Sequence, residues 1–182
     1  MRTIIPQEQN PALRETARPI PLADITGAHV KSLIADMKKL LAKEQHGVAI
    51  AASQVGEPLQ LFIVSGRALA ERDADESKVE GDVTPLPDQI YINPVLTKLS
   101  RAKKEKHEGC LSIRGKWGMV PRAEKATVRA YDENGTVFTR GASGFLAHIF
   151  QHEMDHLDAI LYTDKATRLY DDNDEKISEN DD

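Results

Sequence analysis

The stretch SGFLAHIFQHEMDHL, residues 143–157, predicts a helix near the C-terminal end of this 182-residue chain. Its large apolar residues recur every three or four positions, which places them on one helical face. Ser143 is a candidate cap for the start of the helix. The apolar face comprises Phe145, Leu146, Ile149, Phe150, Met154 and Leu157.

The same helix carries two histidines one turn apart. His152 and His156 project from one face, so both imidazoles can reach a single cation, and Glu153 flanks the remaining coordination position. Two histidines that merely share a helix are the alternative. A catalytic metal site also needs a third protein ligand and a position open to water. No histidine follows His156, so a downstream third ligand is not expected.

Cys110 stands upstream as the only cysteine of the chain. A lone cysteine is most often a small buried hydrophobic residue. Gly109 beside it favours a special role, because glycine allows the backbone to approach another group closely or to turn sharply. Since one cysteine cannot form an internal disulfide, we expect a reducing compartment.

A second helix is predicted in the N-terminal part of the chain. Apolar residues recur at helical spacing from Val30 to Leu41, which predicts a core-facing helix. Asp24 or Thr26 is the expected cap at its start, and Gly47 the expected left-handed cap at its end.

Short strands are predicted between the two helices. Strand-like runs occupy 59–64, 91–96, 126–131 and 136–140, and the last two flank Asn134-Gly135, a strong hairpin signal. Pro94 marks an edge or a bend, and the charged residues 66–88 are expected to form an excursion loop. This order predicts an α+β fold in which antiparallel β-sheets pack around the C-terminal metal-binding helix, with the N-terminal core-facing helix beside them.

Composition and charge indicate one globular domain with an acidic end. The chain is 40% hydrophobic and 29% charged, as in ordinary soluble domains. Seven acidic residues and one lysine give residues 170–182 a charge of −6, so the net charge of −5 leaves +1 for residues 1–169. We expect a single catalytic domain over 1–169 and a frayed acidic tail over 170–182.

The same features exclude several classes of protein. A nearly neutral body lacks the excess of basic residues typical of nucleic-acid binding. No apolar run approaches the roughly 18 residues that a membrane span requires, and no secretory signal opens the sequence. We therefore expect a cytoplasmic protein with no membrane or nucleic-acid partner.

Three segments together resemble the signature motifs of the peptide deformylases, in their order and approximate spacing. They are GVAIAASQ at 47–54, EGCLS at 108–112 and QHEMDH at 151–156. The resemblance extends from the arm around Pro11 to the vicinity of Asp164. It implies a metal-dependent hydrolase that removes the formyl group from the N-terminal formylmethionine of newly synthesised polypeptides and releases formate.

The resemblance also implies a metal site. The ligands would be Cys110, His152 and His156, holding one divalent ion: iron(II) in the cell, with zinc(II) or nickel(II) as alternatives. Glu153 would take a proton from the attacking water and deliver it to the leaving amine.

Further roles follow from the same resemblance. The side-chain amide of Gln54 and the backbone N–H of Leu111 would stabilise the oxyanion, so Gln54 is expected to affect the rate more than folding. Glu108 would pair with Arg122 and orient the metal loop. The substrate-binding residues would be Val48, Ala49, Ile50, Glu108, Gly109, Phe145, His148 and Ile149, with Ile90 as a further candidate for the methionine pocket.

Some positions depart from the family pattern. Ala49 and Ala159 stand where glycine is usual, Arg114 where proline is usual, and Trp117 where arginine often helps to hold the peptide. His148 takes a place that is usually apolar. None of these departures removes an expected ligand, the general base or an oxyanion donor, so we expect the chemistry to be kept. We expect them to affect efficiency and peptide preference instead.

The expected partners are N-formylmethionyl nascent peptides, with a transient ribosome contact. The expected location is the cytoplasm of a bacterial type, or an organelle in the case of a mature organellar form. Two alternatives stay open: a zincin-like peptidase, which the missing downstream ligand disfavours, and a metalloprotein that retains the fold but acts on a different acyl-amine.

Overall fold

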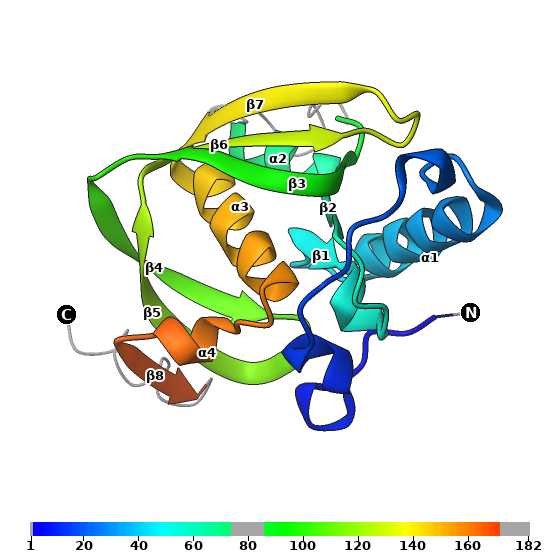
Figure 1. Cartoon of the computed structure of the whole chain (residues 1–182). Helices are drawn as coiled ribbons and strands as arrows, with labels where there is room; N and C mark the ends of the chain where they lie inside the picture. Colours follow the sequence, from blue (N-terminus) through cyan, green and yellow to red (C-terminus); the bar gives the residue numbers. More distant parts are fainter. Residues whose placement is uncertain (1, 74–85, 172–182) are drawn as a thin grey trace.

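The computed structural model describes residues 2–73 and 86–171, and it consists of two antiparallel sheets with a long helix, α3 (Gly144–Leu157), between them (Figure 1). The five-stranded sheet has the order β1-β2-β3-β6-β7, with bounds Ala49–Ala51, Leu61–Val64, Gln89–Leu99, Lys125–Tyr131 and Val137–Ser143. The three-stranded sheet has the order β4-β5-β8, with bounds Lys103–Cys110, Ile113–Ala123 and Arg168–Asp171. The expected α+β class is confirmed.

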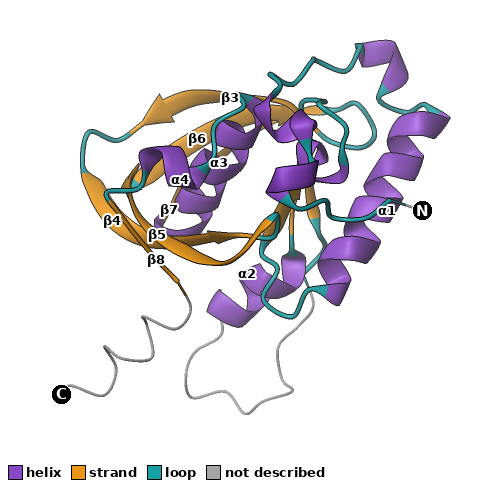
Figure 2. Ribbon diagram, turned by 90° about the horizontal axis from the view of Figure 1, so that it is seen from below, coloured by secondary structure: helices purple, strands orange, loops and turns teal. Residues whose placement is uncertain are grey.

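The remaining helices flank this frame. Helix α1 (Ala28–Lys43) lies at the end of the molecule opposite the three-stranded sheet, and α4 (Tyr162–Lys165) lies beside that sheet (Figures 1 and 2). Helix α2 (Gly66–Asp73) follows β2 directly. The short 3-10 helices are Gln7–Gln9, Pro11–Arg14, Leu22–Asp24 and Ala52–Val55.

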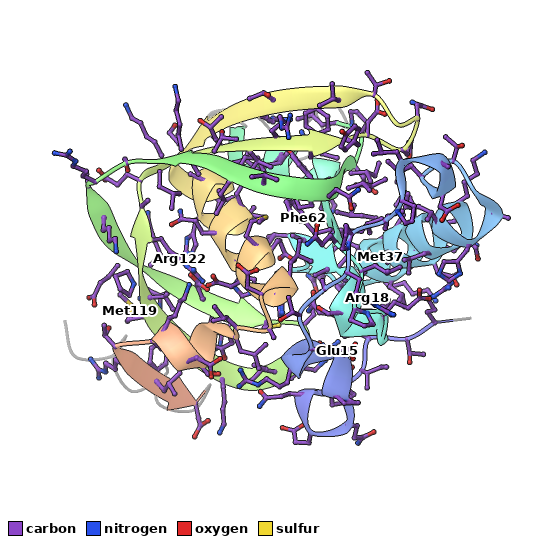
Figure 3. All side chains as sticks on the ribbon, in the orientation of Figure 1. Glu15, Arg18, Met37, Phe62, Met119 and Arg122 are labelled. Atoms are coloured by element: carbon purple, nitrogen blue, oxygen red, sulfur yellow. The ribbon has the colours of Figure 1, made fainter. Side chains whose placement is uncertain are left out.

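Strand β2 shows how the core divides into two layers. All four of its residues are buried. Phe62 belongs to the cluster that packs around α3, and its ring stacks on Tyr91 at 4.7 Å between centroids. Ile63 belongs to the cluster that contains Met37 of α1 (Figure 3). Because side chains alternate along a strand, the same sheet binds α3 on one face and α1 on the other.

The caps predicted for α1 are wrong. Its N-cap is Gly27, and Asp24 ends a preceding 3-10 turn whose carbonyl accepts from the Gly27 N–H. At the other end the helix stops at Lys43, and Glu44 closes the last turn by donating its N–H to the Leu41 carbonyl. Such 3-10 bonds satisfy the terminal carbonyl groups without a left-handed residue.

Gly47 is nevertheless constrained, for a different reason. A Cβ at this position would lie 2.8 Å from Cβ of Glu44 and 3.0 Å from Cδ1 of Leu41. The glycine is therefore required by the close approach of the chain to the end of α1.

The predicted excursion loop is partly wrong. Residues 66–73 form α2, and the Ser65 hydroxyl caps this helix by accepting the Ala68 N–H at 3.3 Å. Leu69 of α2 is buried in the cluster around α3. Residues 74–85 of the predicted loop lie outside the described residues. The sequence does not predict this short helix, because one large apolar residue, Leu69, is too few to show a helical period.

The predicted hairpin is confirmed, and so is the bend at Pro94. Strands β6 and β7 pair up to Tyr131 and Val137, and Asp132 Oδ1 accepts from two N–H groups in the connecting loop. The register of β3 shifts between Ile92 and Val95, next to Asn93 with φ 48°. Strand β3 lies between β2 and β6, so Pro94 marks a bulge rather than an edge.

The sequence does not predict the two long strands β4 and β5. Strand β4 consists largely of exposed charged residues, and it is held by antiparallel pairing with β5 from Lys103–Ala123 to Cys110–Ile113. Because most of its side chains are exposed, β4 has no alternation of apolar and polar residues from which a strand could be predicted.

Tyr170 and Asp171 of the predicted tail belong to β8, and residues 172–182 of that tail lie outside the described residues.

A membrane-spanning helix is not found in the part of the chain that the structure describes, since none there has the required length and apolar character.

Candidate metal centre

Three ligand-type side chains meet where β4 ends beside α3. The donor atoms of Cys110, His152 and His156 all lie within 4.8 Å of one another. Cys110 Sγ lies 3.4 Å from His156 Nε2. The helix supplies both histidines from successive turns of one face, as expected from their spacing. The expected ligand set is therefore brought together.

These residues fit a divalent transition metal. A thiolate and two imidazoles form a donor set suited to zinc or iron(II). His152 Nδ1 lies 2.7 Å from Glu108 Oε2, which leaves Nε2 of that ring for a metal. Burial, followed by the neighbouring His152, lowers the pKa of His156 well below its ordinary value. A neutral imidazole is the form that binds a metal.

Glu108 organises the surroundings of the ligands. It is 4% exposed, and the predicted pair with Arg122 is formed by two hydrogen bonds of 2.6 and 2.9 Å. His148 and His152 also bond to its carboxylate, at 2.6 and 2.7 Å. Burial opposes ionisation, but the hydrogen bonds from Arg122 and the two histidines outweigh it and lower the pKa of Glu108. Glu108 is therefore a buried carboxylate.

Arg122 extends this network along α3 to Asp155. Its Nη1 donates to Asp155 Oδ2 at 2.5 Å, and Lys165 Nζ donates to Asp155 Oδ1 at 2.6 Å. Figure 3 shows Arg122 on β5 facing the helix. The charges of the network are thereby paired within the protein.

Glu153 differs from Glu108 in having little hydrogen bonding. It is 3% exposed, and its Oε2 has no hydrogen-bond partner among the residues that the structure describes. Burial raises the pKa of Glu153 to about 7, although the adjacent His152 opposes the shift. A carboxyl group with such a pKa can both accept and donate a proton near neutral pH.

Gln54 is fixed by one end of its amide. Its Oε1 accepts the Ala51 N–H at 2.8 Å, which orients Nε2 toward Cys110 Sγ at 3.4 Å and Ser112 Oγ at 3.5 Å. Leu111 follows Cys110 and is half-buried at the same site. The amide donor of Gln54 therefore points to Cys110, one of the three candidate ligands.

A pocket of about 690 Å³ opens beside these groups. Most of the residues expected to bind substrate line it, namely Val48, Ala49, Glu108, Gly109, Phe145, His148 and Ile149. Ile50 and Ile90 do not line the pocket, because both are buried in the cluster that packs against α1. The alternation along β1 turns Ala49 to the pocket side and Ile50 to the opposite face.

The pocket also has walls that the sequence did not predict. Glu44, at the end of α1, accepts a hydrogen bond of 2.7 Å from Arg114, and both residues line the pocket. The ring of Trp117 lies so close to Gly109 that an added Cβ would approach it to 3.0 Å. No sequence signal marks Glu44, because its partner lies 70 residues away.

Comparisons with known proteins agree with this geometry. The chain matches the polypeptide deformylase family over residues 2–172. It is 40% identical over 163 residues to a peptide deformylase of Chloroflexus aurantiacus, covering 89% of this chain and 84% of the relative. It is 35% identical over 158 residues to the chloroplastic peptide deformylase 1A of Solanum lycopersicum, covering 86% of this chain and 56% of the relative.

Solved structures show the same fold. A crystal structure of a peptide deformylase from Legionella pneumophila aligns with a TM-score of 0.74 and 30% identity, over 92% of this chain and 86% of that chain. A class I type b peptide deformylase from Acinetobacter baumannii, bound to Met-Ala-Ser, aligns with a TM-score of 0.76 and 26% identity, over 91% and 98%. These matches do not favour the peptidase or the altered-substrate alternative. This chain belongs to the peptide deformylase family.

Proposed function

We propose that this enzyme hydrolyses the formyl group of N-formylmethionyl peptides and releases formate and a free amino terminus. The observation that carries the proposal is the meeting of Cys110, His152 and His156 within 4.8 Å beside a buried, weakly bonded Glu153. The pocket of about 690 Å³ next to them provides room for a peptide end.

Cys110, His152 and His156 are proposed as the ligands of one divalent ion. When bound, such an ion supplies positive charge that acidifies water and polarises a carbonyl oxygen. We take iron(II) as the ion in the cell. Zinc(II) and nickel(II) can replace it, because thiolate and imidazole ligands bind all three ions.

Glu153 is proposed as the group that moves the proton. It takes one proton from the water whose oxygen attacks the formyl carbon. It then gives that proton to the peptide nitrogen as the C–N bond breaks. A pKa of about 7 suits both steps, since the same carboxyl group must accept and donate.

Gln54 and Leu111 are proposed as oxyanion donors. The Oε1 of Gln54 is held by Ala51, so its Nε2 is oriented before substrate arrives. The backbone N–H of Leu111 comes from the residue after the cysteine ligand. Donors fixed in advance stabilise the developing negative charge most effectively.

The apolar part of the pocket is proposed to hold the methionine side chain. Val48, Phe145 and Ile149 provide this surface, and an unbranched thioether fits an apolar slot well. The Acinetobacter baumannii relative is bound to Met-Ala-Ser, which supports a peptide with an N-terminal methionine as the ligand.

The cellular setting is part of the proposal. The substrates would be nascent chains that begin with formylmethionine, met during a transient contact with the ribosome. The relatives include bacterial proteins and a chloroplastic one, which supports a bacterial-type cytoplasm or an organelle. The proposed reaction requires no membrane or nucleic acid.

The test is formate release from formyl-Met-Ala-Ser by protein purified anaerobically and loaded with iron(II) or nickel(II). We expect turnover by the wild type and its loss in Cys110→Ala and Glu153→Ala. Glu15→Ala, at an exposed position, is the matched control and should retain full activity. A folded, metal-loaded protein that releases no formate would overturn the proposal.

A further inference from the structure

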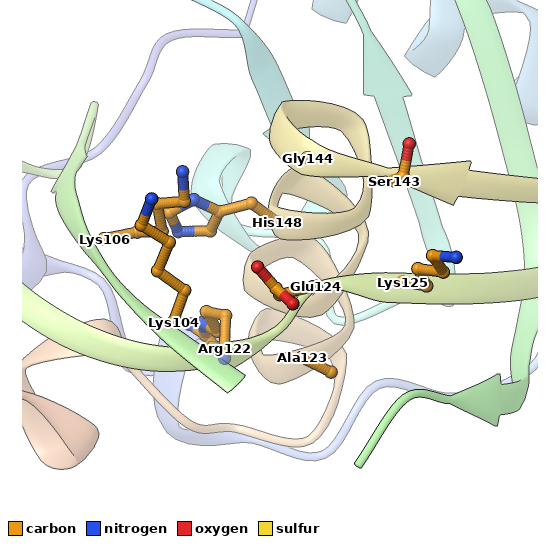
Figure 4. Close-up of a pocket in the computed structure, with 9 residues that line it drawn as sticks. All are labelled: Lys104, Lys106, Arg122, Ala123, Glu124, Lys125, Ser143, Gly144 and His148. Carbon is orange, nitrogen blue, oxygen red and sulfur yellow. The ribbon is translucent and has the colours of Figure 1, made fainter. Parts of the chain in front are cut away.

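His148 borders two cavities. On one side it lines the pocket of about 690 Å³ that contains the metal ligands. On the other side it lines a second cavity of about 260 Å³, together with Lys104, Lys106 and Lys125 (Figure 4). The side chain is 7% exposed. This residue therefore borders both cavities and is itself buried.

The partner of this ring is the carboxylate of Glu108. Oε1 accepts from Arg122 Nε at 2.6 Å and lies 2.6 Å from His148 Nε2. Oε2 accepts from Arg122 Nη2 at 2.9 Å and lies 2.7 Å from His152 Nδ1. Because an ionised carboxylate only accepts hydrogen bonds, both ring nitrogens must act as donors.

These bonds occupy the acceptor capacity of Glu108. A carboxylate has about four lone-pair positions, and each oxygen of Glu108 receives one arginine and one histidine donor. Bonds from two directions prevent rotation of the carboxylate. Arg122 holds the carboxylate of Glu108 from the β5 side, and the two histidines hold it from α3.

The two histidines act as one unit because they lie on successive turns of α3. His148 and His152 are four residues apart, so one face of a helix presents both rings to the same carboxylate. Movement of Glu108 away from His148 would change its alignment with His152. The geometry of the metal ligand is thereby linked to His148.

We propose that His148 is a positioning residue, which holds Glu108 in place so that Glu108 fixes the ring of His152 toward the metal. The inference rests on the proposed metal site. His148 itself does not bind the metal. It supplies the donor that completes the hydrogen bonds of Glu108.

The experiment compares His148→Leu, His148→Gln and His148→Asn in the full-length protein. Leucine removes the donor and keeps an apolar side chain. Glutamine places an amide N–H near the position of Nε2, whereas asparagine is polar but too short to reach Glu108. The zinc dissociation constant is measured by competition with a chelator, and the apo proteins are checked by thermal unfolding.

Outer partners of metal ligands typically contribute about 10- to 100-fold to metal affinity. We expect zinc binding to weaken by about tenfold in the leucine and asparagine variants. The glutamine variant should stay within about threefold of the wild type. The Nδ1–H signal of His152 in ¹⁵N-labelled, zinc-loaded protein should exchange with water faster in the first two variants only.

A purely structural role would lower the unfolding temperature without changing these two measurements. Equal zinc affinity and an unchanged His152 signal in the asparagine and glutamine variants would overturn the inference, even if the leucine variant did not fold. A wild-type protein that binds no zinc would instead refute the metal site itself.

Discussion

Glu153 and Glu108 are both buried glutamates, yet their surroundings give them different protonation behaviour. Glu108 receives donors from Arg122, His148 and His152, which lower its pKa. Glu153 has an oxygen without a partner among the described residues, and burial raises its pKa to about 7. The difference supports the proposed roles of Glu153 in proton transfer and of Glu108 beside the candidate ligands.

Glu153→Gln should lower kcat by about 10²- to 10⁴-fold, because the amide keeps the shape of the side chain but cannot accept the proton. Metal content should stay at the wild-type level, since the change leaves the three ligands intact. Steady-state formate release and metal analysis on one preparation check both expectations. A kcat within tenfold of the wild type would contradict the role of Glu153.

Gln54→Ala should lower kcat by about 10²- to 10³-fold through loss of an oxyanion donor. The effect on the rate should still exceed the effect on folding, but folding is also affected. Gln54 Oε1 is the acceptor for the buried Ala51 N–H, and an unsatisfied buried donor costs about 1–3 kcal/mol. Urea unfolding should therefore show this loss beside the kinetic defect.

The C-terminal end of α3 shows why glycine is usual at position 159, where this chain has alanine. Ile160 donates its N–H to the Asp155 carbonyl at 2.9 Å, and Ala159 donates to His156 at 3.3 Å. These bonds form a Schellman motif, which requires a left-handed residue at Ala159, where φ is 61°. The alanine is strained there because its Cβ approaches the following carbonyl.

Ala159→Gly should stabilise the protein by about 1 kcal/mol, because relief of the left-handed strain exceeds the added chain entropy of glycine. The matched control is Ala35→Gly, at an exposed position inside α1, which should lose about 1 kcal/mol. Urea unfolding of both variants measures the difference. Destabilisation of the same size in both would show that the strain at position 159 is absent.

At the scale of the whole molecule, buried charges join the three-stranded sheet to helix α3. Arg122 of β5 bonds to Glu108 of β4 and to Asp155 of α3, and its side chain is 4% exposed. Each partner comes from a different element. The network therefore forms only when the tertiary structure is complete.

Arg122→Gln should destabilise the protein by about 3–5 kcal/mol, because the buried carboxylate of Glu108 loses its arginine and Asp155 keeps only Lys165. Arg114→Gln is the control, since that arginine pairs with Glu44 but is 65% exposed. An exposed pair contributes about 0–1 kcal/mol. Similar losses in the two variants, measured by urea unfolding, would contradict the role assigned to burial.

A second link ties the N-terminal arm to α4. Arg14 forms an ion pair with Asp164, and Asp164 Oδ2 accepts the Leu161 N–H at 2.8 Å. The hydrogen bond from Arg14 lowers the pKa of Asp164, although burial opposes the shift. Because the folded pKa is lower than the unfolded one, the stabilisation is complete above the unfolded pKa and is lost as pH falls through the folded value.

Asp164→Asn should cost up to about 1 kcal/mol at pH 7, since the pair is partly exposed. The difference from the wild type should begin to shrink below the unfolded pKa of about 3.9, where the carboxylate of the unfolded chain takes up protons, and should be lost below the folded pKa. Urea unfolding at pH 7 and at pH 3.5 checks the sign. A constant difference at both pH values would exclude the charge of Asp164 as its cause.

Local patterns determined much of this protein. The periodicity of residues 143–157 predicted α3, and the four-residue spacing of His152 and His156 placed two ligands on one face. The Asn134-Gly135 dipeptide predicted the β6–β7 hairpin. Each of these features depends on residues close in sequence, so its physical cause is contained in a short segment.

Other features were decided by the tertiary structure alone. Strand β4 is stabilised by backbone pairing with β5, and α2 by the burial of one leucine. Glu44 meets Arg114 across 70 residues, and Glu108 receives donors from β5 and α3. Such contacts join distant segments, and their free energy comes from burial and pairing that exist only after the chain has folded.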